Sequence, residues 1–288
     1  MERQSRTILV VGATGQQGGA VARHLRDTGF HVRALTRDAS SEKAQLLAVH
    51  GDEVVTGNLD DRGSLDRALV GAYGAFSVQN FRLSGIEGEV RQGITLAEAA
   101  KAAGVQHLVY SSVGSAHRRT GIPHFESKFQ VEESIRSLGL PSTILRPVFF
   151  MENWNYSRDA ILSGTLPLPL DPDKPLQQIA VDDIGAFAAL AFAQPDQFLG
   201  RALEIAGDEL TGPQAASVFG RVLGRPVQYV QLPLEQMRQR MGEDGMKMYG
   251  WFNEVGYEAD LAALRSLRPT LLTLEAWLRK TGWAAATA

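Results

Sequence analysis

Apolar and polar positions follow two different rhythms in the first half of the chain. Short runs with apolar, often β-branched centres alternate with stretches in which apolar residues recur every three to four positions. The first rhythm is typical of buried strands and the second of amphipathic helices. The runs predict strands over residues 7–11, 31–36, 53–57, 72–78, 106–112 and 142–146. The helical spacing covers residues 20–28, 42–51, 64–71, 87–103 and 125–138. This alternation predicts an α/β fold of the Rossmann type, a doubly wound parallel sheet covered by helices on both faces.

The pattern changes after Pro147. Residues 153–176 contain four prolines and predict a loop-rich stretch, after which a strand, a helix and a strand over 178–181, 182–193 and 203–206 return to the earlier rhythm. From Thr211 on, the spacing predicts only helices, over 214–223, 234–241 and 271–280. We therefore expect a Rossmann domain made of residues 1–152 and 177–207. A smaller, mostly helical carboxy-terminal domain would comprise residues 153–176 and 208–288.

Charge and hydropathy exclude two classes of partner. The 288 residues contain 29 Lys and Arg against 32 Asp and Glu, a net charge of −3. Such a balance lacks the basic surplus that binds phosphate backbones, so nucleic acid is not expected as a partner. The longest apolar run, residues 186–193, is far shorter than the roughly 18 residues that span a bilayer, so no membrane segment is expected.

The chain contains no cysteine, which excludes disulfides, cysteine nucleophiles and thiolate metal sites. Its six histidines show no clustered spacing, and we expect no metal. The apolar stretch near the amino terminus, residues 8–11, is too short for a signal peptide, so a cytoplasmic protein is expected.

A glycine-rich loop follows the first predicted strand. Residues 12–18 read Gly-Ala-Thr-Gly-Gln-Gln-Gly, the pattern G-x-x-G-x-x-G at the opening of a helix. In a dinucleotide-binding turn, Gly12 makes the tight turn, Gly15 lets the backbone approach a pyrophosphate, and Gly18 lets the helix pack on the strand. Free N–H groups at the helix start attract the anion, although a purely structural turn is the alternative. The residues expected to bind the dinucleotide are Gly12, Thr14, Gly15, Gln16, Gln17 and Gly18.

The end of the second predicted strand selects the nucleotide. An acidic residue about 20 positions after the glycines would bind the adenosine ribose of NAD, whereas an arginine accommodates the extra phosphate of NADP. Thr36 and Arg37 occupy this place, and Arg37 offers a planar fork suited to a phosphate. We therefore expect NADP(H) as the cofactor. The alternative is that Arg37 is a solvated charge and that Asp38 binds the ribose.

Several motifs together resemble the NmrA-like family of atypical short-chain dehydrogenases/reductases. Besides the loop 12–19 and Thr36-Arg37, the motifs are Gly-Asn-Leu-Asp-Asp (57–61), Val-Gln-Asn-Phe (78–81), Val-Tyr-Ser-Ser (109–112), His-Phe-Glu-Ser-Lys (124–128) and Arg-Pro-Val-Phe-Phe-Met-Glu-Asn (146–153). The resemblance covers nearly the whole chain and is much more specific than any one motif. It implies a Rossmann domain, NADP(H) binding and a small carboxy-terminal domain.

The resemblance also implies roles for single residues. Asn58 and Leu59 would close over the adenine, Arg91 would lie near the cofactor phosphates, and Lys128 would contact the nicotinamide ribose. The residues that would line or cover the nicotinamide half are Gln79, Asn80, Phe81, Phe150, Met151, Glu152 and Asn153. Phe81 and Phe150 have the alternative of being ordinary core or hinge aromatics.

The proton-transfer motif departs from the pattern of active short-chain dehydrogenases. These enzymes use Tyr-x-x-x-Lys, in which the lysine lowers the tyrosine pKa so that the phenol exchanges a proton with the substrate. Here Lys128 is retained, but His124 stands in the tyrosine position. A histidine transfers protons near neutral pH, and Ser111 or Ser112 is placed to orient a carbonyl. The candidate catalytic residues are therefore Lys128, His124 and Ser112; the alternative for His124 is a hydrogen-bonded position without proton transfer.

Two function classes follow from these observations. The missing tyrosine favours a redox-state sensor or regulator with little dehydrogenase activity, in which NADP(H) occupancy changes the binding of a regulatory protein partner or a homodimer. The retained lysine keeps an NADPH-dependent oxidoreductase as the alternative, acting on quinones or small carbonyl compounds. Its small-molecule substrate would bind in a cleft between the domains.

Overall fold

The computed structural model describes residues 6–283 and divides the chain into two compact units. The first unit comprises the described residues up to His117, together with His124–Arg146 and Ile184–Leu203. The second comprises Arg118–Pro123, Pro147–Asp183 and the described residues from Glu204 on. Within the described chain, no helix is both long and apolar enough to cross a membrane.

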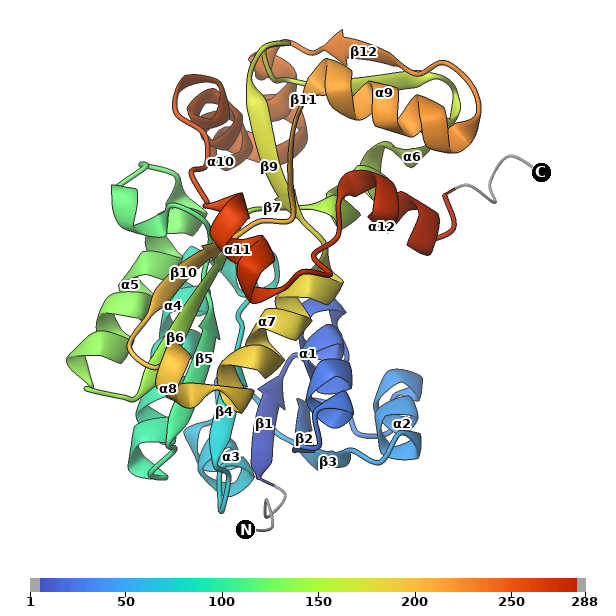
Figure 1. The fold of residues 1–288 in the computed structure, drawn as a ribbon. Coiled ribbons are helices and arrows are strands. Elements are labelled where there is room, and N and C mark those ends of the chain that lie inside the picture. Colours follow the sequence, from blue (N-terminus) through green and yellow to red (C-terminus); the bar gives the residue numbers. More distant parts are fainter. Residues whose placement is uncertain (1–5, 284–288) are drawn as a thin grey trace. The chain divides into compact units, whose positions relative to one another are not determined.

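A seven-stranded sheet is the centre of the first unit (Figure 1), which confirms the Rossmann-type fold. Its order is β10-β6-β5-β4-β1-β2-β3. The strands are β1 (Thr7–Val11), β2 (His31–Thr36), β3 (Glu53–Thr56), β4 (Gly74–Ser77), β5 (His107–Ser111), β6 (Ser142–Pro147) and β10 (Ala202–Ile205). The pairs from β3 through β6 are parallel, so the carboxyl ends of these strands meet at one edge. In doubly wound sheets, this edge is where ligands bind.

Helices cover both faces of this sheet. The helices are α1 (Gln16–Asp27), α2 (Glu42–Val49), α3 (Arg62–Ala68), α4 (Phe81–Ala102), α5 (Pro123–Ser137), α7 (Val181–Ala193) and α8 (Pro195–Phe198), with a 3-10 turn η1 (Ala116–Arg118). One core cluster joins α3, α4 and α5 to alternate strand residues such as Leu9, Leu108 and Tyr110. The intervening strand residues face the other side, where Phe192 of α7 packs on His107. This alternation explains why the strands have apolar centres, since both faces are buried.

The second unit contains two small sheets and several helices. Strands β7 (Phe149–Phe150), β9 (Pro175–Ile179) and β11 (Asp208–Thr211) form a mixed sheet, and β8 (Thr165–Leu168) pairs with β12 (Gln228–Gln231). The helices are η2 (Met151–Ser157), α6 (Arg158–Leu162), α9 (Gly212–Leu223), α10 (Leu234–Glu254), α11 (Leu261–Leu267) and α12 (Leu274–Lys280). Aromatic side chains, among them Trp154, Phe219, Trp277 and Trp283, fill the core of this unit.

Two local expectations for the second unit were wrong. The stretch 153–176, expected as loop, carries most of η2, the helix α6 and the strand β8, and the region after Thr211, expected as helical, contains β12 and the unpredicted helix α11. Strands β8 and β12 hydrogen-bond to each other across about 60 residues of chain, so neither shows as a strand in its own sequence. Helix α10 continues past residue 241 to Glu254 because the helix resumes after a kink at Gly242, whose φ is 73°.

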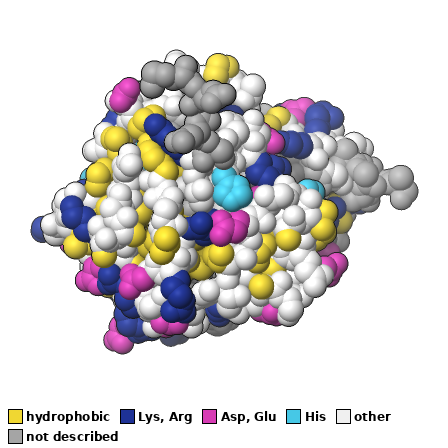
Figure 2. All heavy atoms as spheres, turned by 90° about the horizontal axis from the view of Figure 1, so that it is seen from below, with side chains coloured by type: hydrophobic (Ala, Val, Ile, Leu, Met, Phe, Trp, Pro, Cys, Tyr) yellow, Lys and Arg dark blue, Asp and Glu magenta, His cyan; other side chains and the backbone are white. Residues whose placement is uncertain are grey.

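Charged side chains of both signs are interspersed on the face seen in Figure 2. No continuous basic stripe crosses the coloured residues of that view, in agreement with the net charge of −3.

Candidate functional site

The glycine loop has the backbone geometry of an anion-binding turn. Gly12 has a φ of 68°, and its carbonyl accepts a hydrogen bond of 2.8 Å from the Gly15 N–H. A Cβ added to Gly18 would overlap the backbone of Gly12, so α1 packs on the turn in a way that only glycine permits. Gly15 caps α1 without a side-chain hydrogen bond, and the first turn contains no acidic residue. The N–H groups of that turn are therefore available to an anion.

A side-chain contact ties this loop to the end of β5. The Ser111 hydroxyl donates a hydrogen bond of 2.6 Å to Oε1 of Gln17. Gln16 is exposed and Thr14 half-buried, so both are accessible beside the loop. Ser111, which the sequence suggested as a carbonyl-orienting residue, is thus bonded to the glycine loop.

Thr36 ends β2, and Arg37, the residue expected to contact a phosphate, directly follows it. Thr36 is buried and closes a local turn, accepting a hydrogen bond from the Asp38 N–H and donating one to its carbonyl. The Arg37 side chain is exposed and pairs with no acid in the described chain. Asp38, the alternative ribose ligand, accepts hydrogen bonds from the hydroxyl and N–H of Ser40, which lower the pKa of its carboxyl. This engagement of Asp38 favours Arg37 as the selecting residue.

The loop after β3 lies against α4. Asn58 is exposed and accepts a hydrogen bond from the Asp60 N–H, while Leu59 packs on the core. Arg91 forms an ion pair of 2.9 Å with Asp60, and Gln92 also donates to that carboxylate. The Arg91 hydrogen bond lowers the pKa of Asp60. The structure thus brings Arg91 beside Asn58 and Leu59, with its charge already paired.

Helix α4 begins at the end of β4 with the predicted nicotinamide-side residues. Gln79 is buried, and its amide donates a hydrogen bond of 3.0 Å to the Ser77 hydroxyl. The Asn80 side chain caps α4 by accepting a hydrogen bond from the Arg82 N–H. Phe81, the first helical residue, is half-buried and stacks on His124, with ring centroids 4.8 Å apart and 16° between the planes.

Lys128 is held at the same place by a buried carboxylate. Its Nζ lies 3.0 Å from Oε1 of Glu89 and donates a hydrogen bond of 3.4 Å to the backbone carbonyl of Gln79. Glu89, on α4, is fully buried and also accepts a 2.5 Å hydrogen bond from the Ser127 hydroxyl. The lysine side chain is 12% exposed. The ammonium is therefore anchored, and the side chain that carries it is not fully buried.

His124 and Lys128 lie one turn apart on α5, as their i, i+4 spacing predicts. The rings of Phe125 and His124 pack edge to face, with their centroids 4.8 Å apart and 88° between their planes. Together with the Phe81 stack, this contact orients the imidazole. Lys128 does have a tyrosine near it: the ring centre of Tyr110 lies 6.0 Å from the Lys128 Nζ. Burial raises the pKa of Tyr110, and the charges of Glu89 and Glu132 raise it further. Tyr110 therefore does not replace the missing phenol, which would need a lowered pKa.

Ser112 is engaged by a second buried glutamate. Its hydroxyl donates a hydrogen bond of 2.6 Å to Glu132, which also forms a two-point ion pair with Arg146 and a contact of 2.7 Å with Arg136. Burial opposes ionisation of Glu132, but the Arg146 contacts prevail and lower its pKa. Ser112 is itself buried, so this network favours a structural role over a catalytic one.

The segment predicted to cover the nicotinamide belongs to the second unit. Phe150 pairs with β9, and Met151 is buried in the core of that unit. Glu152 accepts hydrogen bonds from the Val181 N–H and from the Trp277 indole, and burial raises the pKa of its carboxyl. Asn153 is half-buried. A cofactor contact from these residues stays a prediction.

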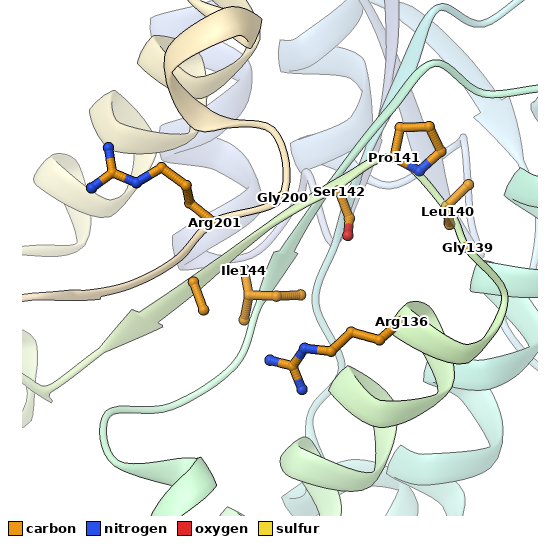
Figure 3. A pocket seen from close by; sticks show the side chains of 9 residues that line it. Arg136, Gly139, Leu140, Pro141, Ser142, Ile144, Gly200 and Arg201 are labelled. Atoms are coloured by element: carbon orange, nitrogen blue, oxygen red, sulfur yellow. The ribbon is translucent and has the colours of Figure 1, made fainter.

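Two other features do not contribute to the site. No group of three or more potential metal ligands occurs among the described residues. A pocket of about 300 Å³ lies at the beginnings of β6 and β10, at the sheet edge opposite the glycine loop (Figure 3). Its two arginines, Arg136 and Arg201, do not turn their guanidinium groups toward each other, and each is bound by protein oxygens.

Glu89 is the residue of this site that sequence reasoning missed. It shares a helical stripe with Gly93, Leu96 and Ala100, all of which are buried. An acidic residue on the buried stripe of a helix is rare unless its charge is paired. The acidic residue at a buried helix position was therefore a signal that the sequence offered. The spacing of the stripe alone did not show that Lys128 is the partner of Glu89.

Comparison with known proteins adds to this geometry. A family model described as the NmrA-like family matches residues 4–278. An NAD(P)H azoreductase of Xenophilus azovorans is 35% identical over 245 residues, which are 83% of this chain and 82% of that protein. The nitrogen metabolite repression protein nmrA of Emericella nidulans is 32% identical over 255 residues, 83% of this chain and 71% of its own length. A crystal structure of NmrA, a negative transcriptional regulator in complex with NADP, has a TM-score of 0.81 at 26% identity and covers 96% of this chain and 95% of its own.

Proposed function

Since the chain belongs to the NmrA-like family, we propose that it binds NADP(H) along the carboxyl edge of the parallel sheet and reduces a small conjugated acceptor. The acceptor class is a quinone or an azo compound. The observation that carries the proposal is the anchored ammonium of Lys128, which a buried carboxylate and a strand-end carbonyl hold beside the His124–Phe81 stack. The 35% identity with an NAD(P)H azoreductase supports the reaction class.

The residues of the first unit fit the dinucleotide. The N–H groups of the α1 start, which no side chain caps, suit a pyrophosphate, and Gly18 leaves the space that a Cβ would fill. The exposed guanidinium of Arg37 suits the phosphate on the adenosine ribose. The Lys128 ammonium has three N–H donors, of which the Gln79 carbonyl accepts one, while the Glu89 carboxylate lies 3.0 Å from Nζ as its ion-pair partner. A donor therefore remains for a ribose hydroxyl.

The chemistry divides between cofactor and protein. When bound, the reduced nicotinamide supplies a hydride, which brings two electrons and one hydrogen to the acceptor. The reduced quinone or hydrazine product needs one further proton, and we assign its donation to the His124 imidazole of α5. Lys128 binds and orients through hydrogen bonds, and water reprotonates His124 from its half-exposed side.

A conjugated acceptor fits a site without tyrosine. Reduction of a simple ketone builds negative charge on one oxygen, so a strong acid beside that oxygen lowers the barrier. A quinone or azo compound delocalises the incoming electron pair, which reduces the need for such an acid. The histidine at the tyrosine position therefore agrees better with these acceptors than with ketones.

A second function, a redox-state sensor, is favoured by the same substitution. A chain that binds NADP(H) without efficient proton transfer would retain the cofactor and report its state to a protein partner or through a homodimer. The 32% identity with a nitrogen metabolite repression protein supports this candidate. The two functions differ in turnover, and cofactor binding is common to both.

The experiment that separates them is NADPH oxidation, followed by absorbance, with a panel of quinones, azo dyes, aldehydes and ketones. We expect turnover with the conjugated acceptors and its loss in Lys128→Ala. Tight NADPH binding without any turnover would support the sensor. Absence of NADPH binding in the wild-type protein would contradict both.

A further inference from the structure

Glu89 occupies a position in which an unpaired charge would be costly. Its side chain is fully buried on α4, and its carboxylate has two polar neighbours, the Lys128 ammonium at 3.0 Å and the Ser127 hydroxyl at 2.5 Å. Burying a carboxylate costs several kcal/mol unless it is paired and hydrogen-bonded. The pair of Glu89 and Lys128 therefore behaves as one neutral unit.

This pair differs from the other buried glutamate of the first unit. Glu132 is bonded to Arg146, Arg136 and Ser112, and Arg146 in turn contacts the His117 ring of η1. Glu89 instead forms an ion pair with Lys128, whose side chain is 12% exposed and lies at the carboxyl edge of the sheet. A buried ion pair of this kind is weak evidence for stability, since apolar residues of similar volume stabilise a core as well. Its effect on the charge of the site is the stronger reason to assign it a role.

We propose that Glu89 is a positioning residue that holds Lys128 for the cofactor and, by neutralising it, sets the preference of the site between NADP⁺ and NADPH. The inference rests on the proposed function, in which Lys128 contacts the nicotinamide ribose. The oxidised nicotinamide ring is cationic and the reduced ring is neutral. An uncompensated ammonium beside the ring repels only the oxidised form, so the Glu89 carboxylate keeps NADP⁺ binding favourable.

The effect is measurable as a ratio of dissociation constants. Glu89→Gln preserves the shape of the side chain and an oxygen for the Ser127 hydroxyl, and it replaces the charged oxygen that faces Lys128 by a neutral NH2 group. We expect this variant to raise Kd(NADP⁺)/Kd(NADPH) about fivefold, the scale of one unit charge acting over several Å in partly solvated protein. Adding Lys128→Met removes the extra positive charge, so the double variant should return the ratio to within about twofold of the wild-type value.

Calorimetric titration of the purified full chain with NADP⁺ and with NADPH gives both constants. Ser127→Ala serves as the matched control because it removes a hydrogen bond to Glu89 and leaves both charges in place, so its ratio should stay at the wild-type value. A merely structural role for Glu89 would weaken both cofactors equally and leave the ratio unchanged, which would overturn the inference. A ratio that remains raised in the double variant would also overturn it, because Glu89 would then not act through Lys128.

If Glu89→Gln does not fold, Glu89→Asp takes its place in the cycle. The shorter side chain keeps the charge and withdraws it from Lys128, so a smaller rise in the ratio is expected, and an unchanged ratio counts against the inference. Failure of the cofactor binding on which this inference rests is distinguishable, since the wild-type protein would then bind neither cofactor, and loss of turnover alone leaves the ratio measurable. Binding of both cofactors, with a ratio insensitive to Glu89, contradicts this inference alone.

Discussion

The ring of His124 lies flat against the ring of Phe81, with 4.8 Å between centroids and 16° between planes. His124 is the second residue of α5 and Phe81 is the first of α4, so the contact joins the starts of two helices beside the carboxyl edge of the sheet. Such a stack favours one orientation of the imidazole. The histidine is therefore held in place at the position where the Tyr-x-x-x-Lys pattern has tyrosine.

His124→Phe tests proton donation and keeps the stack. The phenyl ring preserves the contact with Phe81 but cannot donate a proton, so we expect kcat for a quinone or azo acceptor to fall about 100-fold, the usual contribution of a general acid. NADPH affinity should stay within about twofold of the wild-type value, since the substitution leaves Lys128 in place. Steady-state kinetics and calorimetry measure the two quantities. Unchanged kcat would show that water supplies the proton.

Arg37→Ala tests the choice between NADP(H) and NAD(H). A hydrogen bond to a charged group contributes about 1.5–3 kcal/mol, so NADPH affinity should fall about 10- to 100-fold. NADH lacks the extra phosphate and should bind with nearly unchanged affinity. Asp38→Asn is the matched control, expected to leave the preference for NADPH unaltered because Asp38 is engaged by Ser40. Equal losses for both cofactors in Arg37→Ala would reject the assignment.

Gly18→Ala tests the packing of α1 on the glycine turn. The new Cβ overlaps the backbone of Gly12, so the turn must shift, at a cost of about 1–3 kcal/mol in the free energy of unfolding. NADPH affinity should fall as well because the N–H groups of the turn move with it. The control is Gly250→Ala, in α10, where a Cβ meets nothing within 4 Å and helix propensity predicts a gain of about 1 kcal/mol. Thermal or urea unfolding distinguishes the two, and equal stability of both variants would contradict the packing argument.

His107 predicts a pH dependence of stability. It is fully buried, and its Nε2 lies 2.8 Å from the Thr143 hydroxyl oxygen. Because that hydroxyl donates its hydrogen to the Phe198 carbonyl, the neutral imidazole donates its Nε2–H to the hydroxyl oxygen. Burial lowers the pKa of His107 from 6.5 to about 4. Between pH 6.5 and about pH 4, the unfolded chain therefore binds more protons than the folded chain. The stability contribution of His107 is complete above pH 6.5 and is lost as the pH falls toward 4, by about 3 kcal/mol.

The measurement is urea unfolding of wild-type protein and of His107→Gln between pH 7 and 4. Glutamine keeps a donor for Thr143 and does not titrate, so the stability of the variant should fall less steeply over this range. His50→Gln is the control, because His50 is exposed and should leave the slope unchanged. If the free energy of unfolding falls equally steeply with pH in the wild-type protein and in His107→Gln, then His107 does not cause the pH dependence.

The strands and the glycine loop could be predicted from the sequence because their causes are local. The predicted strands over 7–11 and 31–36 coincide with β1 and β2, whose apolar centres reflect burial on both faces. The predicted ends of the helices agreed less well with the structure than those of the strands. Helix α4 begins at Phe81 instead of residue 87, since Gly85, with a φ of 74°, interrupts the helical spacing near its start. The short strand β12 escaped prediction because three of its four residues are exposed and its hydrogen bonds come from β8.

The sequence by itself determined the Rossmann-type sheet, the glycine turn and the pairing of His124 with Lys128 on one helix. Each follows from periodicity or spacing within a single segment. The tertiary structure alone decided which side chain meets which across segments. It placed Glu89 on Lys128, Phe81 on His124 and Ser112 on Glu132, because parallel strands bring distant segments to one edge. Buried charges must find partners there, and no local pattern states which partner is within reach.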